Sequence, residues 1–197
     1  MIRPARPGRF GGEGNPLFGI LLLGRGRAAG MAQFGATPNA YLASLAPLVA
    51  FPLVGALLLI LRGDPIEALT DFLEVICALL APAVLSQALA RFWRCEAAWL
   101  RYATAFNWCQ WLMPLVLTLA LIVFGIALRL GLPERAAGIG VVGVLALYAL
   151  WLHWFVARHG LGLSGWRSAG LVVVVNVGTL VMLLVPGFLA AAVERAT

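Results

Sequence analysis

The sequence predicts an all-α, polytopic integral membrane helical bundle with about five transmembrane helices, and three observations support this prediction. The chain of 197 residues is 62% hydrophobic and only 11% charged, whereas an ordinary soluble domain is about 25% charged. Its mean hydropathy is +0.97. Its apolar residues are gathered in stretches of about 20 residues or more, the length of helix that crosses the hydrocarbon core of a bilayer. In lipid, that many apolar side chains need no burial inside the protein.

Residues 1–39 differ from the rest of the chain because arginine, glycine and proline are frequent there. The one apolar run of this segment, Leu17 to Leu23, is too short to span a bilayer. Arg25 and Arg27 follow the run, where a signal peptide would place small residues for cleavage. We therefore expect residues 1–39 to form a retained cytoplasmic tail.

Five apolar stretches follow and define a transmembrane domain over residues 40–193, with residues 194–197 as a short C-terminal tail. The predicted spans are 40–61, 66–90, 103–128, 136–156 and 168–193. The second span begins with acidic residues, so it forms either one tilted helix or a hairpin of two half-spans. One tilted helix is the simpler prediction. Five prolines lie inside the predicted spans, where proline is able to kink a helix, namely Pro47, Pro52, Pro82, Pro114 and Pro186.

The arginines predict the orientation of the chain in the membrane. One side of the predicted topology carries Arg3, Arg6, Arg9, Arg25, Arg27, Arg91, Arg94, Arg101, Arg158 and Arg167. The other side carries Arg62, Arg129, Arg135 and Arg195. Cytoplasmic loops are enriched in basic residues, so the N-terminus is predicted inside and the C-terminus outside. All 14 basic residues are arginine, which is typical of a GC-rich genome and favours a bacterial inner membrane.

Three acidic residues lie on one face at the start of the second span. Glu67, Asp71 and Glu74 are spaced i, i+4 and i+7. At 1.5 Å per residue, Glu74 lies about 12 Å beyond Ile66. Carboxylates inside a membrane often mark ion pathways, which predicts an outward-facing cation or proton site. In the alternative, which we favour, the span begins nearer Asp71 and the acids lie in the interface at a helix N-terminus.

A second set of polar residues lies at one depth in the cytoplasmic half of the predicted topology. This polar layer consists of Gln87, Asn107, Gln110, His153 and Asn176. Polar side chains in membrane helices usually bond to one another across the bundle, and we favour that interpretation. The alternative is a polar cavity open to the cytoplasm, in which His153 would titrate.

Small residues on the fourth span, Ala136, Gly140, Gly143 and Ala146, indicate a helix-packing seam. Such a seam lies either within the bundle or between protomers, and the Gly140/Gly143 face is therefore the predicted contact for a second copy or a membrane-protein partner.

The sequence contains none of the common nucleotide-binding, protease or metal-site motifs. Cys77, Cys95 and Cys109 have no metal-site spacing and are expected to be packing residues. We expect no enzymatic activity and no cofactor. Nucleic-acid binding is not expected either, because the arginines are divided among a tail and short loops instead of forming one patch.

Residues 148–169 read YALWLHWFVARHGLGLSGWRSA, an aromatic-rich span end followed by a Gly-Leu-Ser turn and a helix start rich in small residues. This layout, with five spans after a polar tail, resembles bacterial members of the Yip-domain family over residues 40–193. The Asp-Leu-Tyr-Gly-Pro signature of eukaryotic relatives is missing, so their role in vesicle traffic is not implied. The resemblance implies a small membrane protein and assigns no site residue.

Two functions follow from these patterns. The first, which we favour, is a non-enzymatic membrane module that acts by self-assembly or by binding a partner, because a small-residue face is present and catalytic motifs are missing. The second is a small transporter or channel that uses Glu74 and the polar layer.

Overall fold

The computed structural model describes the backbone of residues 14–196 and the side chains of residues 14–184. The described residues form helices and short loops only. The elements are α1 (Pro16–Gly24), the 3-10 helix η1 (Ala28–Gln33), α2 (Pro38–Arg62), α3 (Pro65–Phe92), α4 (Glu96–Cys109), α5 (Leu112–Arg129), α6 (Glu134–Gly160) and α7 (Gly165–Ala196). Five helical segments are long and apolar enough to cross a membrane, namely α2, α3, α4 together with α5, α6, and α7 as far as Leu184. The predicted all-α fold with five spans is confirmed.

The second span is one uninterrupted helix. α3 runs from Pro65 to Phe92 over 28 residues and contains Pro82 without a break. At 1.5 Å per residue this helix is about 42 Å long, which exceeds the hydrocarbon core of about 30 Å. A hairpin of two half-spans is therefore wrong, and the excess length leaves room for the acidic first turns in the interface.

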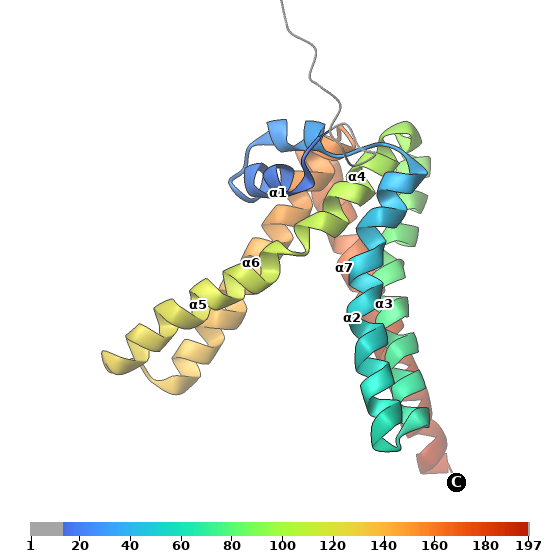
Figure 1. The fold of residues 1–197 in the computed structure, drawn as a ribbon, viewed down its shortest axis with the longest axis vertical. Helices are drawn as coiled ribbons and strands as arrows, with labels where there is room; N and C mark the ends of the chain where they lie inside the picture. Colours follow the sequence, from blue (N-terminus) through green and yellow to red (C-terminus); the bar gives the residue numbers. More distant parts are fainter. Residues whose placement is uncertain (1–13, 197) are drawn as a thin grey trace, which may run out of the picture.

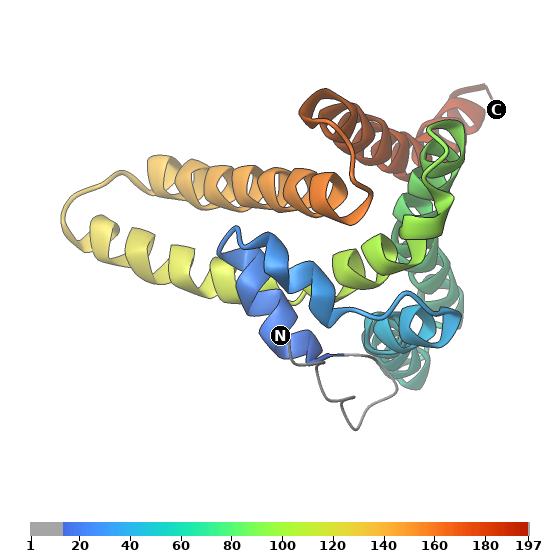
Figure 2. The same ribbon diagram turned by 90° about the horizontal axis from the view of Figure 1, so that it is seen from above.

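The helices form two arms that diverge from a common end (Figure 1). One arm contains α2, α3 and α7, and the other is the hairpin of α5 and α6 (Figures 1 and 2). α4, α1 and η1 lie at the end where the arms meet, which we call the cap end. In the most apolar window of each span only 6% to 22% of the residues are buried within the chain. Most side chains of the arms therefore face lipid.

The third span differs from its prediction because it consists of two helices. The predicted start at residue 103 lies in the middle of α4, and the α-helical hydrogen bonding is interrupted at Gln110 and Trp111, which form a turn while keeping right-handed helical dihedral angles. Pro114 explains this break, since proline has no N–H to donate to the carbonyl of Gln110 and its ring would clash with that carbonyl. The Gln110 carbonyl instead accepts the backbone N–H of Met113 at 3.0 Å. The break allows α5 to leave α4 and join α6.

Two glycines close the turns at the far ends of the arms. Gly63 has a φ of 100° between α2 and α3, and Gly131 has a φ of 97° between α5 and α6. Both values lie in the left-handed region, which glycine adopts without a steric penalty. Each turn thereby returns the chain antiparallel within a few residues.

Part of the segment predicted as a tail is folded on the cap end. Asn15 caps α1 by accepting the backbone N–H groups of Leu17 at 3.0 Å and Phe18 at 3.4 Å. Ile20 and Leu23 of α1 are buried in the main hydrophobic core, while Leu17 and Phe18 are 66% and 52% exposed. α1 therefore has one face in the core and one apolar face open. Arg3, Arg6 and Arg9 lie outside the described residues.

The hydrophobic core lies at the cap end, where elements from both arms meet. Its most deeply buried large side chains are Tyr102, Leu23, Leu171, Val156 and Val175. They come from α4, α1, α7 and α6, so the core joins segments far apart in the sequence. Most of the buried hydrophobic side chains of the described residues belong to this core, and the arms depend on it for their relative position.

The small-residue face of α6 is used within the chain at one of its two glycines. A Cβ on Gly140 would overlap the ring of Phe124 on α5, whereas a Cβ on Gly143 would meet no atom within 4 Å. Gly140 thus allows α5 and α6 to approach closely, as the seam within the bundle requires. Gly143 remains open to a neighbour from outside the chain.

Candidate functional site

The predicted polar layer is divided in the structure, and its best-ordered part is a network around His153. The imidazole of His153 on α6 is 5% exposed. Its Nε2 lies 3.0 Å from the hydroxyl oxygen of Tyr102 on α4, and its Nδ1 lies 3.2 Å from Nδ2 of Asn176 on α7. The network therefore ties together three helices at the point where the two arms meet.

The geometry of the network assigns the proton of His153. Nδ2 of Asn176 also donates to the carbonyl oxygen of Val172 at 2.7 Å, and a carbonyl only accepts, so this atom is the amide nitrogen. Nδ1 of His153 must then accept, and the ring proton sits on Nε2 and is donated to Tyr102. A doubly protonated ring would set two donors against each other at Asn176. The network consequently holds His153 as a neutral imidazole.

A small pocket of about 130 Å³ opens beside this network. Its lining residues are Phe106, Cys109, Gln110, Met113, Ala149, Leu152, His153 and Asn176. Gln110 reaches the pocket because it lies at the break between α4 and α5. The ring of Phe106 packs on His153 with 4.5 Å between ring centroids. The lining formed by described residues combines polar groups without a carboxylate, so the pocket suits an uncharged group that forms hydrogen bonds.

Asn107 belongs to a separate pair. Its Nδ2 donates to the hydroxyl oxygen of Ser44 on α2 at 3.0 Å, and Ser44 donates in turn to the carbonyl of Tyr41 at 2.6 Å. Asn107 and Ser44 are both buried. Gln87 is half-buried on α3, and no hydrogen bond of its side chain to a described residue is present. The structure thus brings together Gln110, His153 and Asn176, and not the whole predicted layer.

Sequence reasoning missed Tyr102, Ser44, Ser86 and Trp99 as members of the polar interior. Trp99 Nε1 donates to the hydroxyl of Ser86 at 3.1 Å, joining α4 to α3. Trp99 and Tyr102 precede the predicted third span, which was expected to begin at residue 103. A single serine in an apolar span has no pattern that marks it, since its hydroxyl usually bonds to its own helix.

The acidic face lies far from this network. Glu67, Asp71 and Glu74 are exposed on α3. Glu74 precedes Gln87 by 13 residues, which is about 20 Å along the helix. Asp71 lines an open groove together with Arg62 at the far end of α2. The acids and the polar layer therefore do not share one site.

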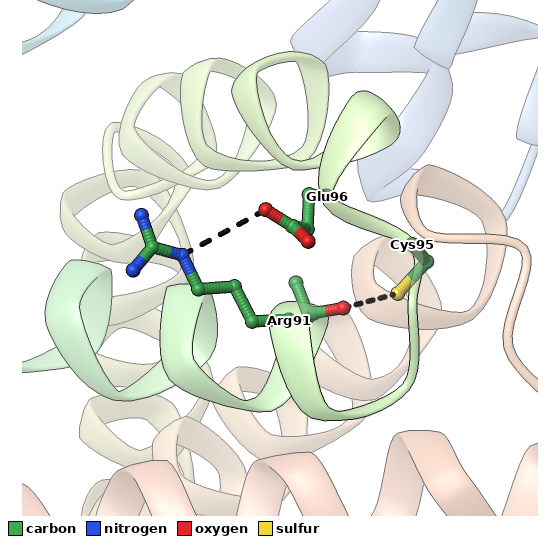
Figure 3. A network of polar contacts seen from close by, with 4 residues as sticks. Arg91, Cys95 and Glu96 are labelled. Atoms are coloured by element: carbon green, nitrogen blue, oxygen red, sulfur yellow. Dashed lines mark hydrogen bonds and ion pairs between the residues drawn. The ribbon is translucent and has the colours of Figure 1, made fainter.

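Most of the described arginines lie at the cap end. One of them, Arg91, belongs to a small network of polar contacts in the loop between α3 and α4 (Figure 3). Nε of Arg91 lies 3.7 Å from a carboxylate oxygen of Glu96, and both side chains are largely exposed, so this ion pair contributes little stability. The thiol of Cys95 lies 3.5 Å from the carbonyl oxygen of Ala90. Burial raises the pKa of the Cys95 thiol above its ordinary value.

We predict that Cys95 reacts slowly with a water-soluble, membrane-impermeant maleimide at neutral pH, and faster as the pH rises. A raised pKa lowers the thiolate fraction, and the thiolate is the reactive form. With the N-terminus inside, the label reaches Cys95 in inverted membrane vesicles and not in spheroplasts. Mass spectrometry of the labelled protein checks both expectations.

Two controls accompany this measurement. The variant Cys95→Ser should remove the labelling, because Cys109 is buried and Cys77 lies on the lipid-facing part of α3. Labelling in spheroplasts alone would reverse the predicted orientation.

Comparison of the chain with protein-family models, with curated proteins and with solved structures gives no match.

Proposed function

We propose that this multi-pass membrane protein is a non-enzymatic module that assembles with a second copy of itself through the α5–α6 hairpin. One observation carries the proposal. The hairpin stands apart from the other arm, so that α5 packs mainly on α6 and leaves its other faces uncovered. In a two-fold symmetric dimer both copies use the same surface for the contact. The uncovered faces of the protruding hairpin are accessible for such a contact.

The pairing of the polar groups supports the same conclusion. Asn107 is bonded to Ser44, and His153 to Tyr102 and Asn176. These contacts hold the bundle together at the cap end and form no continuous polar path toward Glu74. Hydrogen bonds between helices stabilise the bundle, and a module without transport activity needs its polar side chains only for this purpose.

Gly143 is the expected centre of the contact between copies. Apolar faces alone do not drive helix association in lipid, because lipid tails are equally apolar, and close van der Waals packing at small residues supplies the attraction. Gly140 is occupied by Phe124 within the chain, whereas the surroundings of Gly143 are open. A second copy of α6 would therefore approach at Gly143.

The test is the oligomeric state of the protein in lipid nanodiscs or vesicles, measured by single-molecule photobleaching over a series of lipid dilutions. We expect dimers for the natural sequence and about tenfold weaker association for Gly143→Ile, which corresponds to about 1.4 kcal/mol. The isoleucine side chain would hold the helices apart while leaving the fold of one copy intact.

Gly170→Ile is the matched control, because a Cβ on Gly170 on α7 also meets no atom within 4 Å. It should dimerise like the natural sequence. A protein that stays monomeric at every dilution, or equal association of both variants, would contradict the proposal.

The pocket beside His153 favours a second candidate, a small transporter or channel with an uncharged polar pathway. The side chains of Gln110 and Asn176, which line the pocket, would form hydrogen bonds with the transported molecule. A flux assay in proteoliposomes decides, with the double variant Gln110→Leu and Asn176→Leu as the test. Flux that this double variant leaves unchanged would remove the pathway.

Three further proposals concern the setting of the module. The arginines of the cap end support an N-inside, C-outside orientation, and the use of arginine for all 14 basic residues supports a bacterial inner membrane. The layout of residues 148–169 supports a relationship to bacterial Yip-domain proteins. Reporter fusions to both termini test the orientation.

A further inference from the structure

The groove between α2 and α3 near the far end of their arm is a pocket with a volume of about 370 Å³. This volume falls within the range of about 300–1,000 Å³ that is typical of ligand sites. On α2 it is lined by Pro52, Gly55, Ala56, Leu58, Leu59 and Arg62, and on α3 by Asp71, Phe72 and Val75. The groove is therefore apolar along its length and carries one cation and one anion.

The length of the groove matches one leaflet of a bilayer. From Pro52 to Arg62 the helix rises about 15 Å, which is half the hydrocarbon thickness of about 30 Å. Gly55 has no side chain to fill the groove, and a Cβ there would meet no atom within 4 Å. An acyl chain of a single leaflet would lie along this stretch.

The two charged residues that line the groove, Arg62 and Asp71, define the chemistry of the headgroup. Arg62 is the last residue of α2, and Asp71 lies in the second turn of α3. Among the described residues the two side chains form no ion pair with each other within 4.0 Å. A guanidinium pairs well with phosphate, and a carboxylate pairs with an ammonium group. One ligand that carries both groups would satisfy both side chains.

We propose that this groove binds a phospholipid whose headgroup contains a phosphate and a primary ammonium. Arg62 donates to the phosphate, Asp71 accepts from the ammonium, and one acyl chain lies against Gly55 and Leu59. In this site the exposed carboxylate of Asp71 gains a charged partner close to the membrane surface. It does not depend on the self-assembly proposed above.

The test extracts the protein from vesicles that contain equal amounts of phosphatidylethanolamine and phosphatidylglycerol and counts bound lipids by native mass spectrometry. We expect the natural sequence to retain phosphatidylethanolamine preferentially. Arg62→Ala should reduce retention of this lipid at least about fivefold, because the charge-assisted bonds to the phosphate are lost. Asp71→Asn should abolish the preference between the two lipids, because only the ammonium partner is removed.

Arg129→Ala and Glu134→Gln are the matched controls. Arg129 ends α5 and Glu134 begins α6, so both residues are exposed at the turn of the other hairpin. Retention should be unchanged in both. Equal retention of the two lipids by the natural sequence would overturn the proposal, as would an equal loss in Arg62→Ala and Arg129→Ala. A change of oligomeric state in Arg62→Ala with unchanged lipid retention would overturn it as well, and would assign the groove to the protein contact.

Discussion

Tyr102→Ala is expected to lower the free energy of unfolding by about 3–5 kcal/mol, the usual cost of truncating a buried aromatic side chain to alanine. Tyr102 is 1% exposed and is the largest fully buried side chain of the described core. Its removal leaves a cavity where α4 and α6 meet and takes away the acceptor of the His153 proton. Unfolding by a denaturing detergent, followed by tryptophan fluorescence, measures the change.

Two companion variants separate packing from hydrogen bonding. Tyr102→Phe keeps the ring and loses only the hydroxyl, so we expect a loss of about 0.6 kcal/mol and at most about 1.7 kcal/mol. Leu121→Ala removes a side chain of α5 that is 55% exposed, and its effect should be small. If Tyr102→Ala were no more destabilising than Leu121→Ala, the core at the cap end would not hold the arms together.

Gly30→Val should release η1 from α1. A Cβ on Gly30 would lie 2.8 Å from the carbonyl oxygen of Gly19, 2.9 Å from Cγ of Leu23 and 3.0 Å from Cβ of Leu22. Because one of these neighbours is backbone, it cannot move aside without shifting α1. Overpacking of this kind costs about 1–3 kcal/mol. Hydrogen exchange of residues 15–34 should rise while exchange in the arms stays unchanged.

The adjacent variant Ala29→Val is the control for Gly30→Val, because Ala29 is exposed on the same 3-10 helix. It adds similar bulk without a clash, and exchange should remain at the level of the natural sequence. Equal exchange in both variants would mean that α1 and η1 do not pack as a unit.

Hydropathy predicted the spans well because the length of an apolar stretch decides whether it crosses a bilayer. The predicted stretch 66–90 became α3, and 40–61 became α2, each within a few residues of the prediction. The third span was less predictable. Proline is frequent in membrane helices, so Pro114 alone did not predict a break. Only the packing of α5 on α6 shows that a new arm begins after this break.

The polar residues show a different limit. Their depth followed from sequence position, so Gln110, His153 and Asn176 were expected at one level and do meet there. Asn107 lies at the same level and yet bonds to α2 through Ser44. The direction in which a helix faces was not predictable, because lipid-facing and buried faces of these helices are both apolar.

By itself the sequence determined that the chain is an all-helical membrane protein with five spans. The composition and the length of a segment are enough to decide whether it crosses the lipid bilayer as a helix. The tertiary structure decided the remainder: the divergence of the two arms, the folding of α1 and η1 on the cap end, and the partners of each polar side chain. These features depend on contacts between residues far apart in the chain, such as the bond from Tyr148 to the carbonyl of Gly24 at 3.0 Å. Such contacts form only when several helices meet, and no single stretch of sequence contains both of their partners.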